Sequence, residues 1–340
     1  MAEIEKKRLS KKAQIIVISC CAVGGILIGG GAGFLIGHFG KPPTVELGDI
    51  DIDDIDDKPV EGEKSILERY EECKSKGKDP MQVFQLHEIA NIASSKLSIQ
   101  ENYVAWGYGQ VLTAVNLDIL NCSAKNGDKY IEESLSKSQP GAIMNVVVCQ
   151  RDYQTGTTSD SPVKSYVGDI KDSIYSPTYE NAKEKDYTVS EYESVFGKPV
   201  SMPSSYVVSS KTVLTDTVTQ TDPQTGAVKS GLSKITKTDY GYELYLDLHT
   251  TYSVARYYKR MINLSGSNVS LFNYIHLTYK LDNDLNFIST HVEESYVAGM
   301  GNIKASVDGK LDTYFFTSEK FEIPDINQNI NYPKKGESHA

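Results

Sequence analysis

Residues 241–248 read Gly-Tyr-Glu-Leu-Tyr-Leu-Asp-Leu, and this stretch shows the pattern that decides the fold. Large apolar side chains recur at every second position, namely Tyr242, Leu244, Leu246 and Leu248. Successive side chains of a β-strand point to opposite faces, so this strand buries one face and exposes the other. Segments 103–115 and 142–150 also have strand-like composition. The sequence therefore predicts half-buried antiparallel strands.

Turn residues between these segments predict hairpins. Asn126-Gly127 and Asp308-Gly309 are two-residue type I′ turn signals between strand-like flanks. Residues 222–226 fit a longer turn with a glycine in the left-handed region, and residues 282–285 close a fourth hairpin. Four local hairpins predict a meander, in which consecutive strands lie side by side.

Two helices are expected ahead of the strands. The first carries Ile66, Leu67, Tyr70 and Cys73 on one face and ends at Gly77. Asp79-Pro80 then starts a second helix, whose apolar stripe comprises Phe84, Ile89, Ile92, Ala93 and Leu97. Helices gathered before a run of strands predict an α+β domain over residues 64–324, with one curved antiparallel sheet. Residues 154–186 are polar and poorly patterned, so a boundary between two lobes there stays open.

An uncharged stretch over residues 13–37 predicts a membrane-spanning helix. Twenty-five helical residues reach about 37 Å, enough to cross a hydrocarbon core of about 30 Å. Five basic residues lie within residues 1–12, which places this leader in the cytoplasm and residues 38–340 outside. A cleaved signal peptide would need a shorter apolar region and a cleavage motif. A lipidated Cys20 would leave most of the apolar stretch without a role, so an uncleaved single-pass anchor is the preferred interpretation.

The predicted span carries a glycine at every fourth position, at Gly25, Gly29, Gly33 and Gly37. Small residues at this spacing let two helices approach closely in lipid, which predicts a homodimer or a partner helix. The alternative is that glycine is simply common in membrane helices.

Acidic composition marks the segment that follows the span. Residues 38–63 contain Pro42-Pro43 and several aspartates, which predicts an extended, solvated stalk. Asp49, Asp51 and Asp53 have the spacing of a calcium loop, but Asp54 and Val60 replace the required Gly and Glu. At the other end of the chain, residues 325–340 are expected to be a disordered tail.

Charge and cysteine content narrow the function classes. Residues 13–340 hold 30 basic and 43 acidic residues, a net charge of −13, which argues against nucleic acid as a partner. Cys73, Cys122 and Cys149 follow the span in no metal or redox spacing. Cys122 and Cys149 are compatible with one disulfide or with two buried thiols.

The last predicted hairpin contains two histidines. A loop centred on residues 283–284 places His276 opposite His291, with Glu293 on the same face. Two imidazoles and a carboxylate are groups that bind zinc or respond to low pH. The alternative is a pair of solvent-exposed histidines without a ligand. Ile275, Leu277, Ile288 and Val292 are expected to face the core.

A basic cluster stands out in the acidic domain. Arg256, Lys259 and Arg260, with Tyr257, lie in a segment of helical spacing after a strand. These residues would contact an anionic head group, a wall polymer or the membrane surface. A short crossover helix with solvated charges is the simpler interpretation.

Tyrosines recur through the strand segments and would suit a pocket for an apolar or glycan ligand, or simply the sheet itself. The seven are Tyr103, Tyr108, Tyr242, Tyr245, Tyr274, Tyr279 and Tyr314. The sequence lacks Gly-x-Ser-x-Gly, His-Glu-x-x-His, a phosphate loop and a dinucleotide fingerprint. We therefore expect no enzyme activity and no cofactor.

The order of helix, long strands, the phrase NGDKYIEES at 126–134 and the hairpin KLDNDLNFISTHVEESY at 280–296 resembles a known architecture. It is similar to the half-barrel ectodomains of bacterial lipoprotein carriers and mycobacterial lipid-binding lipoproteins, over residues 80–320. The resemblance implies a curved sheet over helices around an apolar cavity that binds a lipid-like envelope component. A membrane anchor replaces the free or lipidated N-terminus of that family, and no binding residues carry over.

Together these features predict a membrane-anchored extracytoplasmic binding or interaction protein. The alternative is a structural subunit of a membrane complex, acting through its glycine-faced helix and its outer domain.

Overall fold

The computed structural model describes residues 64–112, 116–127, 129–140, 147–155, 163–170, 179–196, 208, 214, 220–221, 228–229, 233–249, 268–300 and 303–316. The predicted leader, span, stalk and tail (1–12, 13–37, 38–63 and 325–340) lie outside these ranges. No helix within the described ranges is long and apolar enough to cross a membrane.

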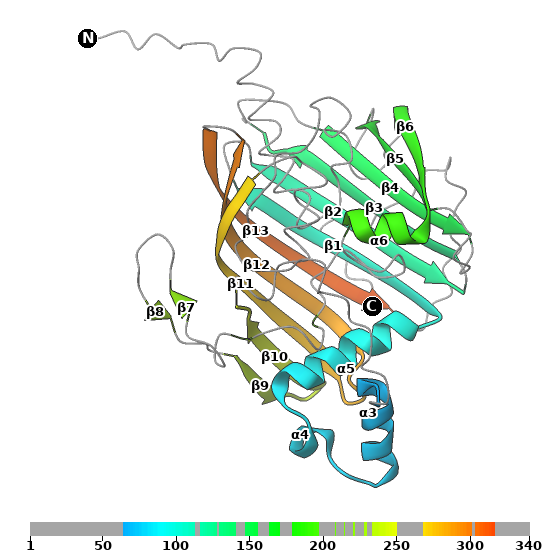
Figure 1. Ribbon diagram of the computed structural model, residues 1–340, viewed down its shortest axis with the longest axis vertical. Coiled ribbons are helices and arrows are strands. Elements are labelled where there is room, and N and C mark those ends of the chain that lie inside the picture. The colour runs from blue at the N-terminus through cyan, green and yellow to red at the C-terminus, as the bar shows by residue number, and fades with distance from the viewer. Residues whose placement is uncertain are drawn as a thin grey trace.

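Eleven antiparallel strands form the main sheet, in the order β6-β5-β4-β3-β2-β1-β13-β12-β11-β10-β9 (Figure 1). The first meander comprises β1 (Asn102–Leu112), β2 (Leu117–Asn126), β3 (Lys129–Ser138), β4 (Val147–Thr155), β5 (Val163–Ile170) and β6 (Tyr179–Tyr187). The second comprises β9 (Lys234–Lys237), β10 (Gly241–Asp247), β11 (Asn268–Asp282), β12 (Phe287–Met300) and β13 (Ile303–Phe316). Within the polar segment 154–186, the described strands β5 and β6 pair in this same sheet beside β4.

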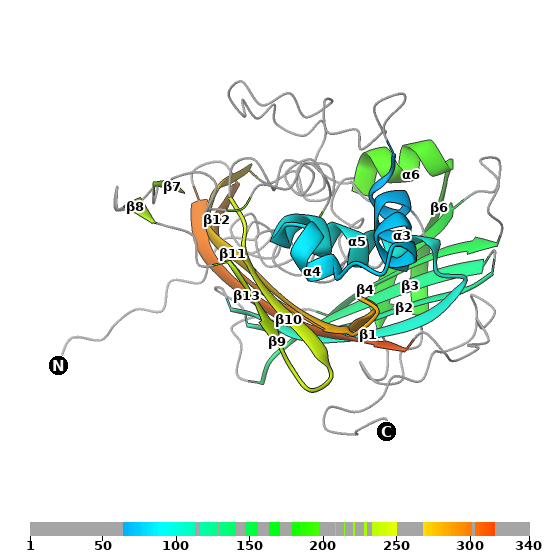
Figure 2. The same cartoon turned by 90° about the horizontal axis from the view of Figure 1, so that it is seen from below.

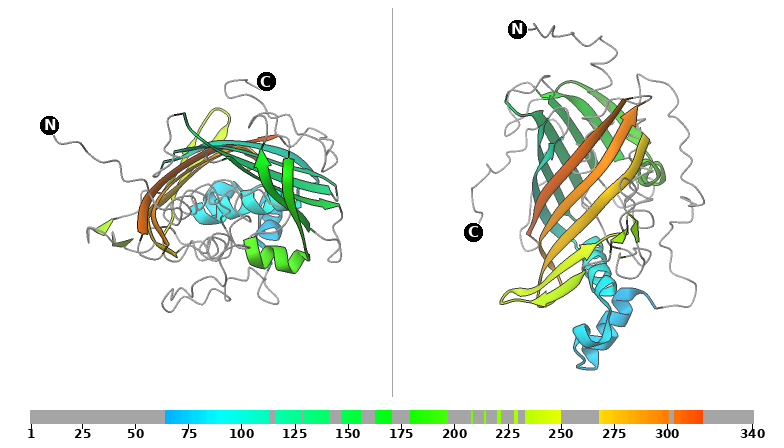
Figure 3. Two further views of the ribbon diagram at one scale, coloured as in Figure 1. Left: turned by 90° about the horizontal axis from the view of Figure 1, so that it is seen from above. Right: turned by 90° about the vertical axis from the view of Figure 1, so that its left-hand side faces the viewer.

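The sheet curves, and four helices within the described ranges accompany it. They are α3 (Ile66–Ser75), α4 (Pro80–Val83), α5 (Leu86–Ile99) and, after β6, α6 (Val189–Phe196). Helices α5 and α6 lie on the concave side of the sheet, while α3 and α4 lie at its end near the β11–β12 turn (Figures 1, 2 and 3). The predicted α+β class with a mostly antiparallel, curved sheet and a few helices is therefore confirmed.

Side-chain caps explain where the helices begin. Ser65 accepts a hydrogen bond from the Glu68 N–H (3.2 Å), and the Glu68 carboxylate accepts one from the Ser65 N–H (2.7 Å). Asp79 caps α4, but this helix lasts a single turn because Phe84 is extended. The Gln85 N–H then donates to Glu88 (2.9 Å) and α5 begins. The single helix predicted from Asp79 is thus two helices, while its apolar stripe is buried as expected.

The core lies between α5 and the concave face of the sheet. Leu244 and Leu246 of β10, Ile275 and Leu277 of β11 and Ile92 of α5 are all fully buried in one apolar cluster. The period-two prediction for residues 241–248 is therefore confirmed. Burying such a side chain contributes about 1.5–3 kcal/mol, so this cluster is a main source of stability.

The β11–β12 turn is tied to the helices. Asp284 in this turn forms an ion pair with Lys74 (2.9 Å). The Asp284 backbone oxygen accepts hydrogen bonds from the side chains of Tyr70 (3.2 Å) and Lys96. The next residue, Leu285, has φ +63 and is buried. The turn thus inserts into the helix layer and aligns α3 and α5 with the sheet.

Two of the four hairpin predictions need correction. Asn126 pairs with Lys129, so the β2–β3 loop starts at Gly127, one residue later than predicted. Asp308-Gly309 forms no turn but lies within β13, where burial alternates without interruption from Ser306 to Phe315. Pairing with β1 and β12 on both sides outweighs the local turn preference of these two residues. The β11–β12 hairpin is confirmed, and β7 (Gln220–Thr221) pairs with β8 (Val228–Lys229) around the predicted 222–226 turn.

The buried Cys122 forms no disulfide. It lies on β2, and β3 separates this strand from Cys149 on β4. A Cys122–Cys149 bond is therefore excluded by the strand order, and the buried-thiol interpretation holds for Cys122.

Among the glycines that the structure describes, Gly241 is the one whose replacement should lower stability most. It has φ +145, and an added Cβ would overlap the Leu281 carbonyl oxygen. We expect Gly241→Ala to lower the free energy of unfolding by at least about 2 kcal/mol. Gly127→Ala is the matched control, because Gly127 has φ +61 but open space around it; its cost should be about 1 kcal/mol. Chemical unfolding of both variants, followed by circular dichroism, measures the difference, and equal losses would contradict the overlap argument.

Candidate functional site

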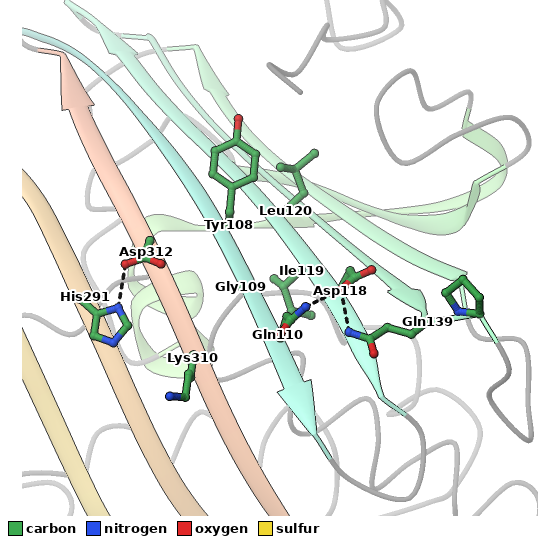
Figure 4. Close-up of a pocket in the computed structure, with 11 residues that line it drawn as sticks. Tyr108, Gly109, Gln110, Asp118, Ile119, Leu120, Gln139, His291, Lys310 and Asp312 are labelled. Carbon is green, nitrogen blue, oxygen red and sulfur yellow. Dashed lines mark hydrogen bonds and ion pairs between the residues drawn. The ribbon is translucent and has the colours of Figure 1, made fainter. Parts of the chain in front are cut away.

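A pocket of about 540 Å³ opens on the convex, outer face of the sheet. Strands β1, β2, β12 and β13 line it, together with Gln139 and Pro140 after β3 (Figure 4). Its polar side chains are Tyr108, Gln110, Asp118, Gln139, His291, Lys310 and Asp312. The volume lies within the 300–1,000 Å³ that is usual for small-molecule sites.

Strand register brings these residues together in two rows that run across the strands. The first row consists of His291, Asp312, Tyr108 and Leu120, on β12, β13, β1 and β2. The second row crosses six strands, from β10 to β2, through Asp247, His276, Glu293, Lys310, Gln110 and Asp118. Directly opposed residues on antiparallel strands lie about 4.5–5.5 Å apart, so each row brings its side chains into contact range.

Ion pairs and hydrogen bonds connect neighbours within the rows. His291 Nδ1 lies 2.7 Å from Asp312 Oδ1 in the first row. In the second row, Lys310 Nζ lies 2.6 Å from Glu293 Oε1. Opposite charges on adjacent strands stabilise the sheet, so these contacts help to hold the floor of the pocket in place.

Asp118 is the second focus of contacts in the pocket. Its Oδ1 accepts a hydrogen bond from Gln110 Nε2 (3.2 Å) and another from Gln139 Nε2 (2.9 Å). Figure 4 shows both amides pointing at this carboxylate. The two amides hold the orientation of Asp118 at the edge of the pocket.

These contacts shift proton affinities on the outer face. The hydrogen bond to Asp312 raises the pKa of His291 above its usual 6.5, and the Glu293 carboxylate adds to this effect. The hydrogen bond from Lys310 lowers the pKa of Glu293, and the same contact raises the pKa of Lys310. Each group therefore favours its charged form.

The two predicted histidines share a face but do not oppose each other. His276 pairs with Glu293, and Thr278 pairs with His291. The register differs from the predicted one by two residues. Leu281 pairs with Phe287, which is one residue beyond the predicted pairing, and the irregularity between Lys280 and Leu281 adds the second. The same irregularity leaves Ile288 38% exposed, so its predicted core position is wrong, while Ile275, Leu277 and Val292 are buried as expected.

His276 lies outside the pocket. Its ring stacks on Tyr274 (centroids 4.6 Å apart), and its Nε2 lies 3.5 Å from Asp247 Oδ1. Among the described residues, no three His, Cys, Asp or Glu side chains are grouped so that they could hold a metal ion. His291 Nε2 lies 3.5 Å from Glu293 Oε1, whereas His276 pairs with Asp247 and is not part of that group.

Other predicted residues lie outside the described ranges. These are the basic cluster of Arg256, Tyr257, Lys259 and Arg260, and the glycines Gly25, Gly29, Gly33 and Gly37. Of the predicted tyrosines, Tyr108 lines the pocket, Tyr103 and Tyr279 are buried in the core, and Tyr314 is exposed on the outer face.

Sequence reasoning missed Gln110, Asp118, Gln139, Lys310 and Asp312. Side chains alternate between the two faces along β1 and β13. This alternation could have placed Gln110, Lys310 and Asp312 on the outer face of the sheet. The pairing of β1 with β13 joins segments about 200 residues apart, and no local pattern reports it.

Comparison with protein-family models, curated proteins and solved structures finds no match to this chain.

The His291–Asp312 pair predicts a specific pH response. Because the folded pKa of His291 lies above its usual value, the pair stabilises the fold at acidic pH. That contribution is lost as the pH rises through the folded pKa. We expect NMR of histidine-labelled protein to give a His291 midpoint above 6.5, and Asp312→Asn to lower it. Asp308→Asn, an exposed carboxylate on the same strand, should leave the midpoint unchanged; an equal effect of both variants would contradict the pairing.

Proposed function

We propose that this chain is a membrane-anchored extracytoplasmic binding protein that presents the outer face of its sheet to a ligand. The observation that carries the proposal is the outer pocket, in which four hydrogen-bonded strands hold polar side chains in fixed register. Sites built on strands hold their side chains more rigidly than sites on loops. Residues 13–37 supply the single-pass anchor in this proposal, with residues 1–12 in the cytoplasm.

The lining of the pocket favours binding over catalysis. It contains the His291–Asp312 pair but no serine, threonine or cysteine among its described residues. A histidine–aspartate pair serves covalent catalysis only when a serine, threonine or cysteine lies within hydrogen-bond reach. The proposal therefore describes a protein without enzyme activity or cofactor, and its net charge of −13 beyond residue 12 disfavours nucleic acid.

A lipid-like or envelope ligand in the concave side of the sheet is a second candidate. The curved sheet wraps around α5, whose apolar residues Ile89, Ile92 and Leu97 pack into the core cluster. A ligand there would displace α5 from the sheet.

The alternative function, a structural subunit of a membrane complex, draws on the Gly25–Gly37 repeat of the predicted span.

The location of the domain is tested by cysteine labelling in intact cells. Asp239 is exposed between β9 and β10, so Asp239→Cys should react with a membrane-impermeant maleimide without permeabilisation. Ser10→Cys, in the predicted leader, is the matched control and should react only after lysis. Background from Cys73 and Cys122 should be low because both thiols are buried. Labelling of Asp239→Cys only after lysis would overturn the proposed orientation.

Native mass spectrometry of the full chain, released from detergent micelles, separates the candidate functions. A retained small-molecule mass is expected for a binding protein, and a lipid mass would favour the concave side. A dimer mass that Gly29→Ile abolishes would support the structural alternative. A bare monomer in every preparation would argue against both.

A further inference from the structure

Hydrogen-bonding capacity remains unused in the outer pocket. Both hydrogen bonds that Asp118 accepts go to Oδ1, and Oδ2 accepts none from the described residues. Asp312 likewise uses Oδ1 for His291. A carboxylate has about four acceptor sites, so each of these groups has room for a ligand donor.

Donors lie between the two carboxylates. Lys310 donates to Glu293, and Gln110 donates one N–H to Asp118. An ammonium has three N–H groups and an amide has two, so both residues have donors left for a ligand. The pocket therefore offers donors and acceptors side by side, across strands spaced about 4.8 Å apart.

The charge pattern argues against an ionic ligand. The Lys310 ammonium is already paired with the Glu293 carboxylate, and the described lining contains no arginine for phosphate or carboxylate recognition. Asp312 lies on β13 and Asp118 on β2, with β1 between them, so their side chains are about 10 Å apart and cannot chelate one cation. An uncharged ligand that both donates and accepts hydrogen bonds fits these groups best.

Apolar surface completes the pocket. Tyr108 and Leu120 oppose each other on β1 and β2 and form its upper part in Figure 4. A tyrosine ring presents an apolar body and a polar tip, which suits a ligand with C–H and O–H groups on the same ring.

We propose that the outer pocket binds the sugar ring of a glycan, through Asp118, Gln110, Lys310 and Asp312 with contact to Tyr108. Sugar hydroxyls donate and accept hydrogen bonds, as this lining requires. The inference rests on the proposed binding function and assigns the ligand class. The same chemistry serves a free oligosaccharide and a sugar unit of an envelope polymer.

The full chain, held in an amine-oxide detergent without a sugar head group, is tested on an array of immobilised glycans. The best-binding sugar is then titrated by calorimetry as a free oligosaccharide and, separately, as an insoluble polysaccharide in a sedimentation assay. Binding of the free sugar would identify a soluble ligand, whereas binding of the polymer alone would identify an envelope component. Kd should change little between about 50 and 500 mM salt, because the ligand is uncharged.

Asp118→Asn is the main variant, since its Oδ1 still accepts from Gln110 and Gln139 while the second acceptor is lost. We expect Kd to weaken about tenfold, the usual effect of removing one hydrogen bond to a charged group. Asp308→Asn is the matched control, because Asp308 is exposed on the same face of β13 outside the pocket. Its affinity should equal that of the unmodified chain, and circular dichroism checks that both variants fold.

Absence of glycan binding, or equal Kd values for Asp118→Asn and the unmodified chain, would overturn the sugar assignment. Native mass spectrometry then distinguishes a failure of the sugar assignment from a failure of the proposed binding function. A retained ligand of another class would leave the binding function standing, whereas the absence of any ligand would remove both.

Discussion

The pairing of β1 with β13 is the constraint on which the rest of the structure depends. These strands join the two meanders, and their register runs from Val104–Phe316 to Leu112–Asp308. Without this pairing the molecule would consist of two separate sheets with exposed edges, which are prone to aggregation. Gly107 shows how tightly the junction packs, since an added Cβ would lie 3.2 Å from the Leu311 and Thr313 side chains. Closing a loop of about 200 residues costs entropy before these contacts form, so we expect the junction to form late in folding.

The outer pocket exists because of this junction. His291, Lys310 and Asp312 come from the second meander, whereas Tyr108, Gln110 and Asp118 come from the first. Each half of the sheet supplies only part of the lining. Assembly of the site is therefore coupled to completion of the fold, which limits ligand binding to the fully folded chain.

The two faces of the sheet have different roles. The concave face packs Ile275, Leu277 and Leu311 against the helix layer and supplies stability. Along the same strands the alternate residues His276, Glu293 and Lys310 face outward and pair across strands. Because the core does not depend on the outer side chains, the outer face of these strands can carry charge patterns that suit a ligand. The β11–β12 turn completes the arrangement, since Asp284 anchors it to Lys74 and leaves the outer face uncovered by α3 and α5.

Local sequence was sufficient for features that depend on near neighbours. The period of two in residues 241–248, the cap at Asp79 and the end of α3 near Gly77 are local properties of the backbone and its adjacent side chains. The shared face of His276 and His291 could be predicted for the same reason. Their register could not, because the turn and the irregularity between Lys280 and Leu281 each shift the pairing of His276 by one residue, and no local pattern reports either shift.

By itself the sequence determined the α+β class, the meander and the buried face of the strands, since these follow from spacing along the chain. Only the tertiary structure decided that Asp308-Gly309 continues a strand and that Asp118 and His291 line the same pocket. The physical reason is that hydrogen bonds from two flanking strands outweigh a turn preference of two residues. The contacts between β1, the first strand of the sheet in the chain, and β13, the last, likewise depend on the assembly of both meanders.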